Sequence, residues 1–200
     1  MKDIKRLSRS AADGPARALG RLGFTPNALT ILGSVLTASV GVLAANGWFA
    51  AAGICLWLFS ATDTLDGALA RATDSASTFG AFLDSVCDRY AEAAVYLGLV
   101  WWYQSIGDGL GVVLAYLAIV GSLMVSYARA RAEGVGLQAA EVGWFQRPER
   151  IVALGVGLLL APFAPAVLLL ALAVLALLTT VTVLQRVLHV ARATGVRQGR

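Results

Sequence analysis

Four aspartates lie close together in an otherwise apolar part of the sequence, and their spacing is suited to holding metal ions. Asp63 and Asp66 are three residues apart, and Asp84 and Asp88 are four residues apart. Residues with either separation lie on one face of a helix. Because the chain between the two pairs is short, we expect two neighbouring antiparallel helices whose ends bring the four carboxylates together.

Four carboxylates in a membrane protein need positive charge nearby, because ionised groups are costly to bury. Hard oxygen ligands favour Mg²⁺, Mn²⁺ or Ca²⁺ over Zn²⁺. Four of them suit two divalent ions, an arrangement that stabilises the attacking and leaving oxygens of phosphoryl transfer. Gly67, Ala70 and Gly80 would leave room for a ligand beside the helix backbones.

Charge alone leaves two other interpretations of these aspartates open. The first is a proton relay in a transporter, since carboxylates inside membrane helices also serve pumps. The second is a set of buried ion pairs with nearby arginines. The pairs would join Asp63 or Asp66 to Arg71, and Asp84 or Asp88 to Arg89.

The elements that position these groups are predicted to be membrane helices. The chain is 58% hydrophobic and 14% charged, with a mean hydropathy of +0.73, whereas soluble domains are about a quarter charged. A spanning helix needs roughly 20 mostly apolar residues. We therefore predict an all-α, polytopic membrane protein with six transmembrane helices in a single domain, 1–200. The predicted spans are 27–45, 48–71, 78–103, 109–129, 148–161 and 166–187.

Residues 1–23 form a segment of a different kind. Six of them are lysine or arginine, and Leu19 and Leu22 are three residues apart. A helix with one basic and one apolar face lies on a membrane surface. We therefore predict a short amphipathic juxtamembrane helix before the first span.

The distribution of basic residues predicts the orientation. All sixteen lie at the two termini, between the second and third or the fourth and fifth spans, or at the span ends beside these connections. Basic residues of this kind stay in the cytoplasm, so both termini and the acidic site are predicted to be cytoplasmic, at the plasma membrane. The net charge of +4 then indicates anionic lipid head groups as partners, and no nucleic acid.

The acidic segment resembles the signature of the CDP-alcohol phosphotransferase family at all eight defining positions. It has the pattern Asp63-x2-Asp66-Gly67-x2-Ala70-Arg71-x8-Gly80-x3-Asp84-x3-Asp88. The resemblance implies six membrane helices around a cavity that is open to the cytoplasm, and often a homodimer. It also implies attack by an acceptor hydroxyl on the lipid-linked phosphorus of a CDP-activated lipid such as CDP-diacylglycerol, with release of CMP.

The resemblance also implies roles for individual residues. Asp88 would complete the metal site and act as the catalytic general base. The metal ligands, for two Mg²⁺ or Mn²⁺ ions, would be Asp63, Asp66, Asp84 and Asp88. The positions that accommodate the CDP-lipid nucleotide and diphosphate would be Gly67, Ala70, Arg71 and Gly80.

Arginines around the connection between the fourth and fifth spans bear on the acceptor. Guanidinium groups bind phosphate well, so a basic pocket here would suit a soluble phosphorylated alcohol, although ordinary membrane anchoring also explains single arginines. Arg129 and Arg131 are two residues apart, so both face the acceptor only if that helix end is irregular. The predicted acceptor phosphate ligands are Arg129, Arg131, Arg147, Arg150 and Arg186.

This arginine set is similar to that of the actinobacterial phosphatidylinositol phosphate synthases within the family. The similarity implies inositol phosphate as acceptor. Arg129 stands where that group has lysine, which changes the donor geometry. A phosphatidylglycerophosphate synthase that uses glycerol 3-phosphate is therefore the alternative, and an ion or proton transporter is a more distant one.

Two further polar residues are left with open roles. Glu92 lies one turn beyond Asp88 and is predicted to pair with Arg89 or to support the metal ligands. His189 is the only histidine, and it lies near the end of the last span. It is interpreted as a membrane-interface residue or as a ligand.

Overall fold

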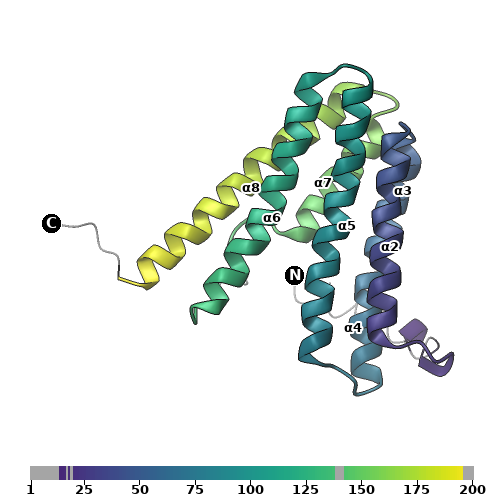
Figure 1. Ribbon diagram of the computed structural model, residues 1–200, viewed down its shortest axis with the longest axis vertical. Coiled ribbons are helices and arrows are strands. Elements are labelled where there is room, and N and C mark those ends of the chain that lie inside the picture. The colour runs from purple at the N-terminus through teal and green to yellow at the C-terminus, as the bar shows by residue number, and fades with distance from the viewer. Residues whose placement is uncertain (1–13, 17, 19, 138–141, 196–200) are drawn as a thin grey trace.

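Every regular element that the computed structural model describes is a helix (Figure 1). The described residues are 14–16, 18, 20–137 and 142–195. The predicted all-α class is confirmed, whereas the predicted interfacial helix over 1–23 lies largely outside these residues. The helices are α2 (Pro26–Ala45), α3 (Phe49–Ser60), α4 (Thr62–Ala72), α5 (Thr78–Ser105), α6 (Gly109–Gly134), α7 (Arg147–Leu160) and α8 (Pro165–Ala193).

The predicted span over 48–71 comprises two helices in the structure. It consists of α3 and α4, which are interrupted at Ala61. The Thr62 hydroxyl donates a hydrogen bond of 2.5 Å to the Phe59 carbonyl. A hydroxyl that binds a carbonyl of the preceding turn competes with the helix backbone and bends the helix. The other five predicted spans each correspond to one helix.

Among the described helices, three are long and apolar enough to cross a membrane, namely α2, α6 and α8. Helix α5 has 28 residues, but Asp84, Asp88 and Glu92 interrupt its apolar sequence. Helix α7 has only 14 residues, so at a rise of 1.5 Å per residue it is about 21 Å long, less than the roughly 30 Å of a hydrocarbon core.

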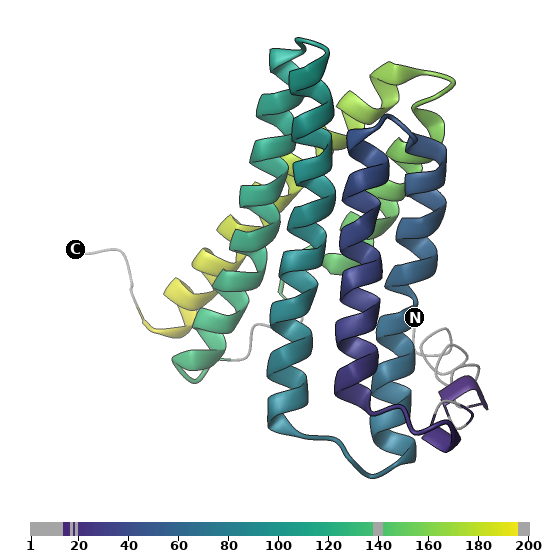
Figure 2. The ribbon, with the colours of Figure 1, turned by 45° about the vertical axis from the view of Figure 1, so that its right-hand side comes forward.

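Helices α2 and α5 lie side by side in both ribbon views (Figures 1 and 2). Their backbones come into contact at Gly41 and Gly98, where a Cβ atom on either glycine would overlap main-chain atoms of the other helix. Val40 and Leu99 are fully buried next to this contact, within the main apolar core. The glycines therefore fix the start of α2 close to the acidic first turns of α5.

A second apolar cluster fixes α4 against the N-terminal end of α2. It contains Leu29 of α2 and Ala68 and Leu69 of α4, and Ala16 from the segment before α2 completes it. Figure 2 shows α4 and the first turns of α5 at the same end of the molecule. The cluster buries one face of α4, so that Asp66 lies between α4 and α2.

The outer faces of the long helices carry large apolar side chains. Leu97 of α5, Tyr116 of α6 and Leu177 of α8 are among the many that are exposed. Monomeric soluble proteins rarely expose so much contiguous apolar surface. The exposed faces are therefore suited to contact with lipid.

Candidate metal centre and two adjoining cavities

The four aspartates lie on α4 and α5, on either side of a short connection. The Ser77 hydroxyl accepts a hydrogen bond of 3.0 Å from the Gly80 N–H and caps the first turn of α5. Asp84 and Asp88 follow on successive turns of this helix. The two pairs are neighbours in space, since one arginine, Arg147, contacts both Asp63 on α4 and Asp88 on α5.

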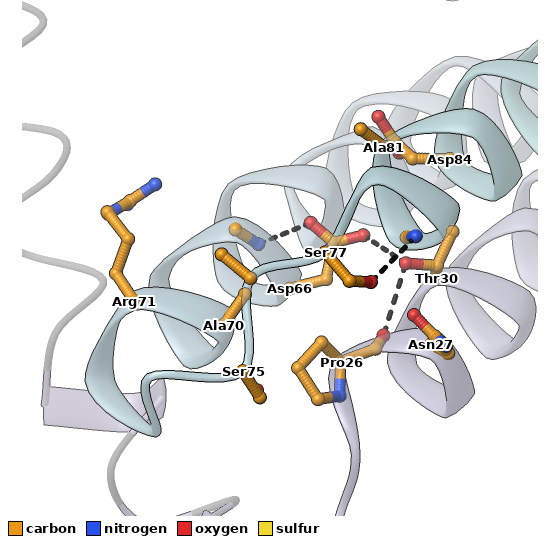
Figure 3. Close-up of a pocket in the computed structure, with 13 residues that line it drawn as sticks. Pro26, Asn27, Thr30, Asp66, Ala70, Arg71, Ser75, Ser77, Ala81 and Asp84 are labelled. Carbon is orange, nitrogen blue, oxygen red and sulfur yellow. Dashed lines mark hydrogen bonds between the residues drawn. The ribbon is translucent and has the colours of Figure 1, made fainter.

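Asp66 is held in place by α2. The Thr30 hydroxyl donates a hydrogen bond of 2.6 Å to Asp66 Oδ2 and lies 3.1 Å from the Pro26 carbonyl (Figure 3). The Gly67 N–H donates a hydrogen bond of 2.5 Å to Asp66 Oδ1. Sequence reasoning missed Thr30, although a buried hydroxyl on an apolar helix opposite an aspartate is a signal that could have indicated it.

Asp63 and Asp88 share one guanidinium group. Arg147 Nη1 lies 2.5 Å from Asp63 Oδ2, and Arg147 Nη2 lies 2.8 Å from Asp88 Oδ1. Arg89 lies 3.6 Å from Asp88. Of the ion pairs considered from the sequence, the Asp88–Arg89 contact is present, but the main partner of both Asp63 and Asp88 is an arginine from a distant part of the chain.

These side chains fit a divalent metal centre in their chemistry. Within the residues that the structure describes, no three acidic, histidine or cysteine side chains converge as ready-made ligands. Thr30 binds Asp66, and Arg147 binds Asp63 and Asp88. The donors are nevertheless hard oxygens, which Mg²⁺ and Mn²⁺ prefer. Asp63 and Asp88 already hold a cationic group between them.

A cavity of about 270 Å³ opens beside Asp66 and Asp84 (Figure 3). Helices α2, α4 and α5 form its walls, and a Cβ atom on Gly80 would lie only 3.1 Å from Asn27 Oδ1. The absence of a side chain there keeps the cavity open. All four residues predicted for the nucleotide line it, namely Gly67, Ala70, Arg71 and Gly80.

A larger cavity of about 980 Å³ lies on the other side of the acidic residues. Asp84 lines both cavities, and Asp88 lines the larger one. The walls of the larger cavity come from α5, α6, α7 and α8. Four of the five predicted acceptor arginines line it, namely Arg129, Arg147, Arg150 and Arg186.

Arg131 is the predicted acceptor ligand that the structure places elsewhere. It lies in an adjoining, mainly apolar groove of about 310 Å³, beside Met124 and Val187. This groove shares Tyr127 and Arg186 with the larger cavity, but Arg131 itself does not line that cavity. Helix α6 stays regular through Gly134, so two residues along it point to opposite sides. The irregular helix end that would bring Arg131 to the acceptor cavity is not present.

Arg150 and Arg186 reach the larger cavity from buried positions. Arg186 donates to the Val125 and Val142 carbonyls, so it fastens α8 to α6 and to the segment before α7. Arg150 is 1% exposed and binds Glu92 through two hydrogen bonds of 2.8 and 2.9 Å. Glu92 therefore pairs with Arg150 and not with Arg89, which was one of the two roles considered for it.

Comparison with known proteins assigns the class to which this fold and site belong. The model of the CDP-alcohol phosphatidyltransferase family matches residues 24–195. The chain belongs to this family, which confirms the resemblance and the class of enzyme predicted from its aspartates.

One curated relative is the phosphatidylinositol phosphate synthase of Mycobacteroides abscessus. It is 42% identical over 139 residues, which are 68% of this chain and 63% of that protein. The chain thus matches somewhat less than two thirds of that relative's length.

Two crystal structures of the Mycobacterium tuberculosis phosphatidylinositol phosphate synthase share the fold. The one with CDP-DAG bound has a TM-score of 0.87 at 33% identity and covers 94% of this chain and 98% of that chain. The one in complex with manganese and citrate has a TM-score of 0.85 at 34% identity, with coverages of 94% and 93%.

The buried Glu92–Arg150 pair leads to a stability prediction. Glu92→Gln leaves the Arg150 charge buried with only a neutral amide beside it, and breaking a buried pair in this way costs about 3 kcal/mol or more. We expect that loss in the free energy of unfolding, measured by denaturation in mixed micelles. The matched control is Glu133→Gln, whose partner Arg129 lies 2.9 Å away on the surface and which should cost about 1 kcal/mol or less. Equal losses would contradict a structural role for the buried pair.

Proposed function

We propose that this chain transfers the phosphatidyl group of CDP-diacylglycerol to a hydroxyl of inositol phosphate and releases CMP. The observation that carries the proposal is the position of Asp84, which lines both cavities. One cavity is bordered by the small residues of the family signature, and the other is bordered by arginines. A donor and an acceptor bound in the two cavities would therefore meet at the aspartates.

The smaller cavity is proposed to hold the cytidine nucleotide and its diphosphate. Gly67 and Gly80 leave the helix backbones accessible there, and Arg71 supplies an exposed cation at the rim. The relative from M. tuberculosis that has CDP-DAG bound supports this choice of donor. The chain shares its fold.

The aspartates are proposed to hold two divalent ions, Mg²⁺ or Mn²⁺, which would neutralise the diphosphate and stabilise the departing CMP. Asp63, Asp66 and Asp84 would serve as ligands only, whereas Asp88 would also accept the proton of the acceptor hydroxyl. The acceptor oxygen forms a bond to the lipid-linked phosphorus as the bond from that phosphorus to the CMP oxygen breaks. The manganese in the relative's structure supports the choice of metal.

The larger cavity is proposed to bind the acceptor's phosphate. Arg129 and Arg147 lie on its wall with part of their surface exposed, and arginine binds phosphate in a two-pronged geometry. Arg186 adds buried positive charge behind them, whereas the charge of Arg150 is paired with Glu92. The names of the mycobacterial relatives favour inositol phosphate over glycerol 3-phosphate.

We place the enzyme in the plasma membrane as a single domain, 1–200, with six spans and cytoplasmic termini. The apolar α2, α6 and α8 support three of the spans directly. The combined α3 and α4, the charged α5 and the short α7 would supply the other three around the polar cavities. The basic segment 1–23 would lie on the membrane surface, and the family resemblance supports a homodimer.

An acceptor panel tests the proposed reaction. Purified protein with CDP-diacylglycerol and Mn²⁺ should release CMP with inositol phosphate and turn over at least about tenfold more slowly with glycerol 3-phosphate, as expected when a site's polar groups lose their partners. Turnover with glycerol 3-phosphate alone would contradict the proposed acceptor. CMP release without added metal would contradict the proposed metal centre, and ion flux without CMP release would indicate a carrier.

Thr30 provides a test of the proposed metal ligands. Thr30→Val keeps the shape of the side chain but removes the hydroxyl that orients Asp66. Losing such a support typically lowers metal affinity about tenfold or more. We expect this weakening in Mn²⁺ titrations followed by electron paramagnetic resonance.

Two controls accompany the Thr30 variant. Thr30→Ser, which retains the hydroxyl, should restore the affinity. Thr37→Val removes a buried hydroxyl elsewhere on α2 and should leave the affinity near that of the wild type. An unchanged Mn²⁺ affinity in Thr30→Val would remove Asp66 from the proposed ligand set.

A further inference from the structure

We propose that Arg147 is the internal counterion of the acidic site, and that divalent ions displace it into the acceptor cavity. The inference rests on the proposed function, because it takes Asp63 and Asp88 as metal ligands. It gives Arg147 two alternating partners, the carboxylates when metal is absent and the acceptor's phosphate when metal is bound. It also gives Arg147 a different role from Arg150, which stays bound to Glu92 whether or not metal is present.

The contacts of Arg147 are those of a counterion. Its two terminal nitrogens bind two different carboxylates, Asp63 on α4 and Asp88 on α5, at 2.5 and 2.8 Å. No arginine closer in the sequence spans these two residues in the part of the chain that the structure describes. A guanidinium in this position neutralises charge that would otherwise force α4 and α5 apart.

The same contacts leave Arg147 incompletely satisfied. Its Nε atom is buried and has no hydrogen-bond partner among the described residues. A buried donor without a partner costs roughly 1–3 kcal/mol. The carboxylate-bound position therefore keeps a penalty that a rearranged side chain with a new acceptor would remove.

Arg150, in contrast to Arg147, has a single fixed partner, Glu92. Helix α5 presents Asp88 and Glu92 one turn apart, and α7 presents Arg147 and Arg150 one turn apart. The pair between Glu92 and Arg150 is two-pronged and almost fully buried. It ties α7 to α5 at this turn, so the backbone of Arg147 stays in place while its partly exposed side chain can turn.

The larger cavity is the place to which the Arg147 side chain can turn. Arg147 lines that cavity together with Arg129 and Arg186. Two divalent ions carry as much positive charge as four carboxylates carry negative charge, so bound metal removes the electrostatic hold on the guanidinium. A phosphate in the cavity then becomes its strongest available partner.

Arg147→Met tests the exchange, because it keeps a long unbranched side chain without the charge. In the metal-free protein we expect its melting temperature to fall by a few degrees relative to the wild type, since two carboxylates lose their cation. With saturating Mn²⁺ the two melting temperatures should coincide. Mn²⁺ affinity, measured by electron paramagnetic resonance, should rise about tenfold because a competing cation is gone.

Arg129→Met is the matched control. Arg129 lines the same cavity but pairs with Glu133 rather than with an aspartate of the site. Its loss should lower the metal-free melting temperature by less than Arg147→Met does, because the pair that it breaks is exposed, and should change the Mn²⁺ affinity by no more than about twofold. A tenfold rise in Mn²⁺ affinity for this variant too would mean that general charge, and not the carboxylate contact, governs metal binding, and would overturn the inference.

The destination of the side chain is tested by binding of inositol phosphate to the protein, measured by calorimetry without CDP-lipid. Affinity should be higher with Mn²⁺ than without it, and Arg147→Met should abolish that difference. An equal drop in melting temperature with and without Mn²⁺, or a Mn²⁺ effect on inositol phosphate affinity that survives in Arg147→Met, would overturn the inference alone. A wild-type protein that binds no Mn²⁺ would overturn the proposed function as well.

Discussion

Mutual repulsion among four carboxylates is the constraint on which the rest of this structure depends. Asp63, Asp66, Asp84 and Asp88 lie on α4 and α5 as neighbours in a largely apolar molecule, where two of them, Asp66 and Asp88, are buried. Their neighbours supply what such a cluster needs, namely a hydroxyl from Thr30 and a guanidinium from Arg147. The same need for positive charge makes the cluster suited to divalent cations, and through them to a diphosphate.

The fold meets this constraint by keeping the acidic helix ends rigid and open on two sides. The glycine contact between α2 and α5, together with the apolar cluster of α2 and α4, fixes three helices around the smaller cavity. The Glu92–Arg150 pair fixes α7 against α5 on the side of the larger cavity. Asp84 lies where the two cavities meet, so the geometry favours transfer between two separately bound substrates.

Much of this arrangement could be predicted from the sequence, because its signals are local. Hydropathy gave helix bounds close to those observed, and the spacing of the aspartates and small residues predicted the cavity beside Asp66. The break at Ala61 was missed because it depends on one threonine hydroxyl. The partners of Glu92, Asp63 and Asp88 were missed because α7 lies far away in the sequence, and sequence spacing carries no information on such contacts. The family motif was not enough to place Arg131, because helix periodicity turns this side chain away from the cavity that Arg129 lines.

The central claim is that the carboxylates of α4 and α5 jointly bind divalent cations, and manganese anomalous diffraction tests it most directly. In crystals grown with Mn²⁺ we predict two anomalous peaks, a few ångströms apart, each within bonding distance of oxygens from both helices. The guanidinium of Arg147 should then have left Asp63 and Asp88. Peaks absent from this position, with Arg147 still between the two aspartates at saturating Mn²⁺, would contradict the claim.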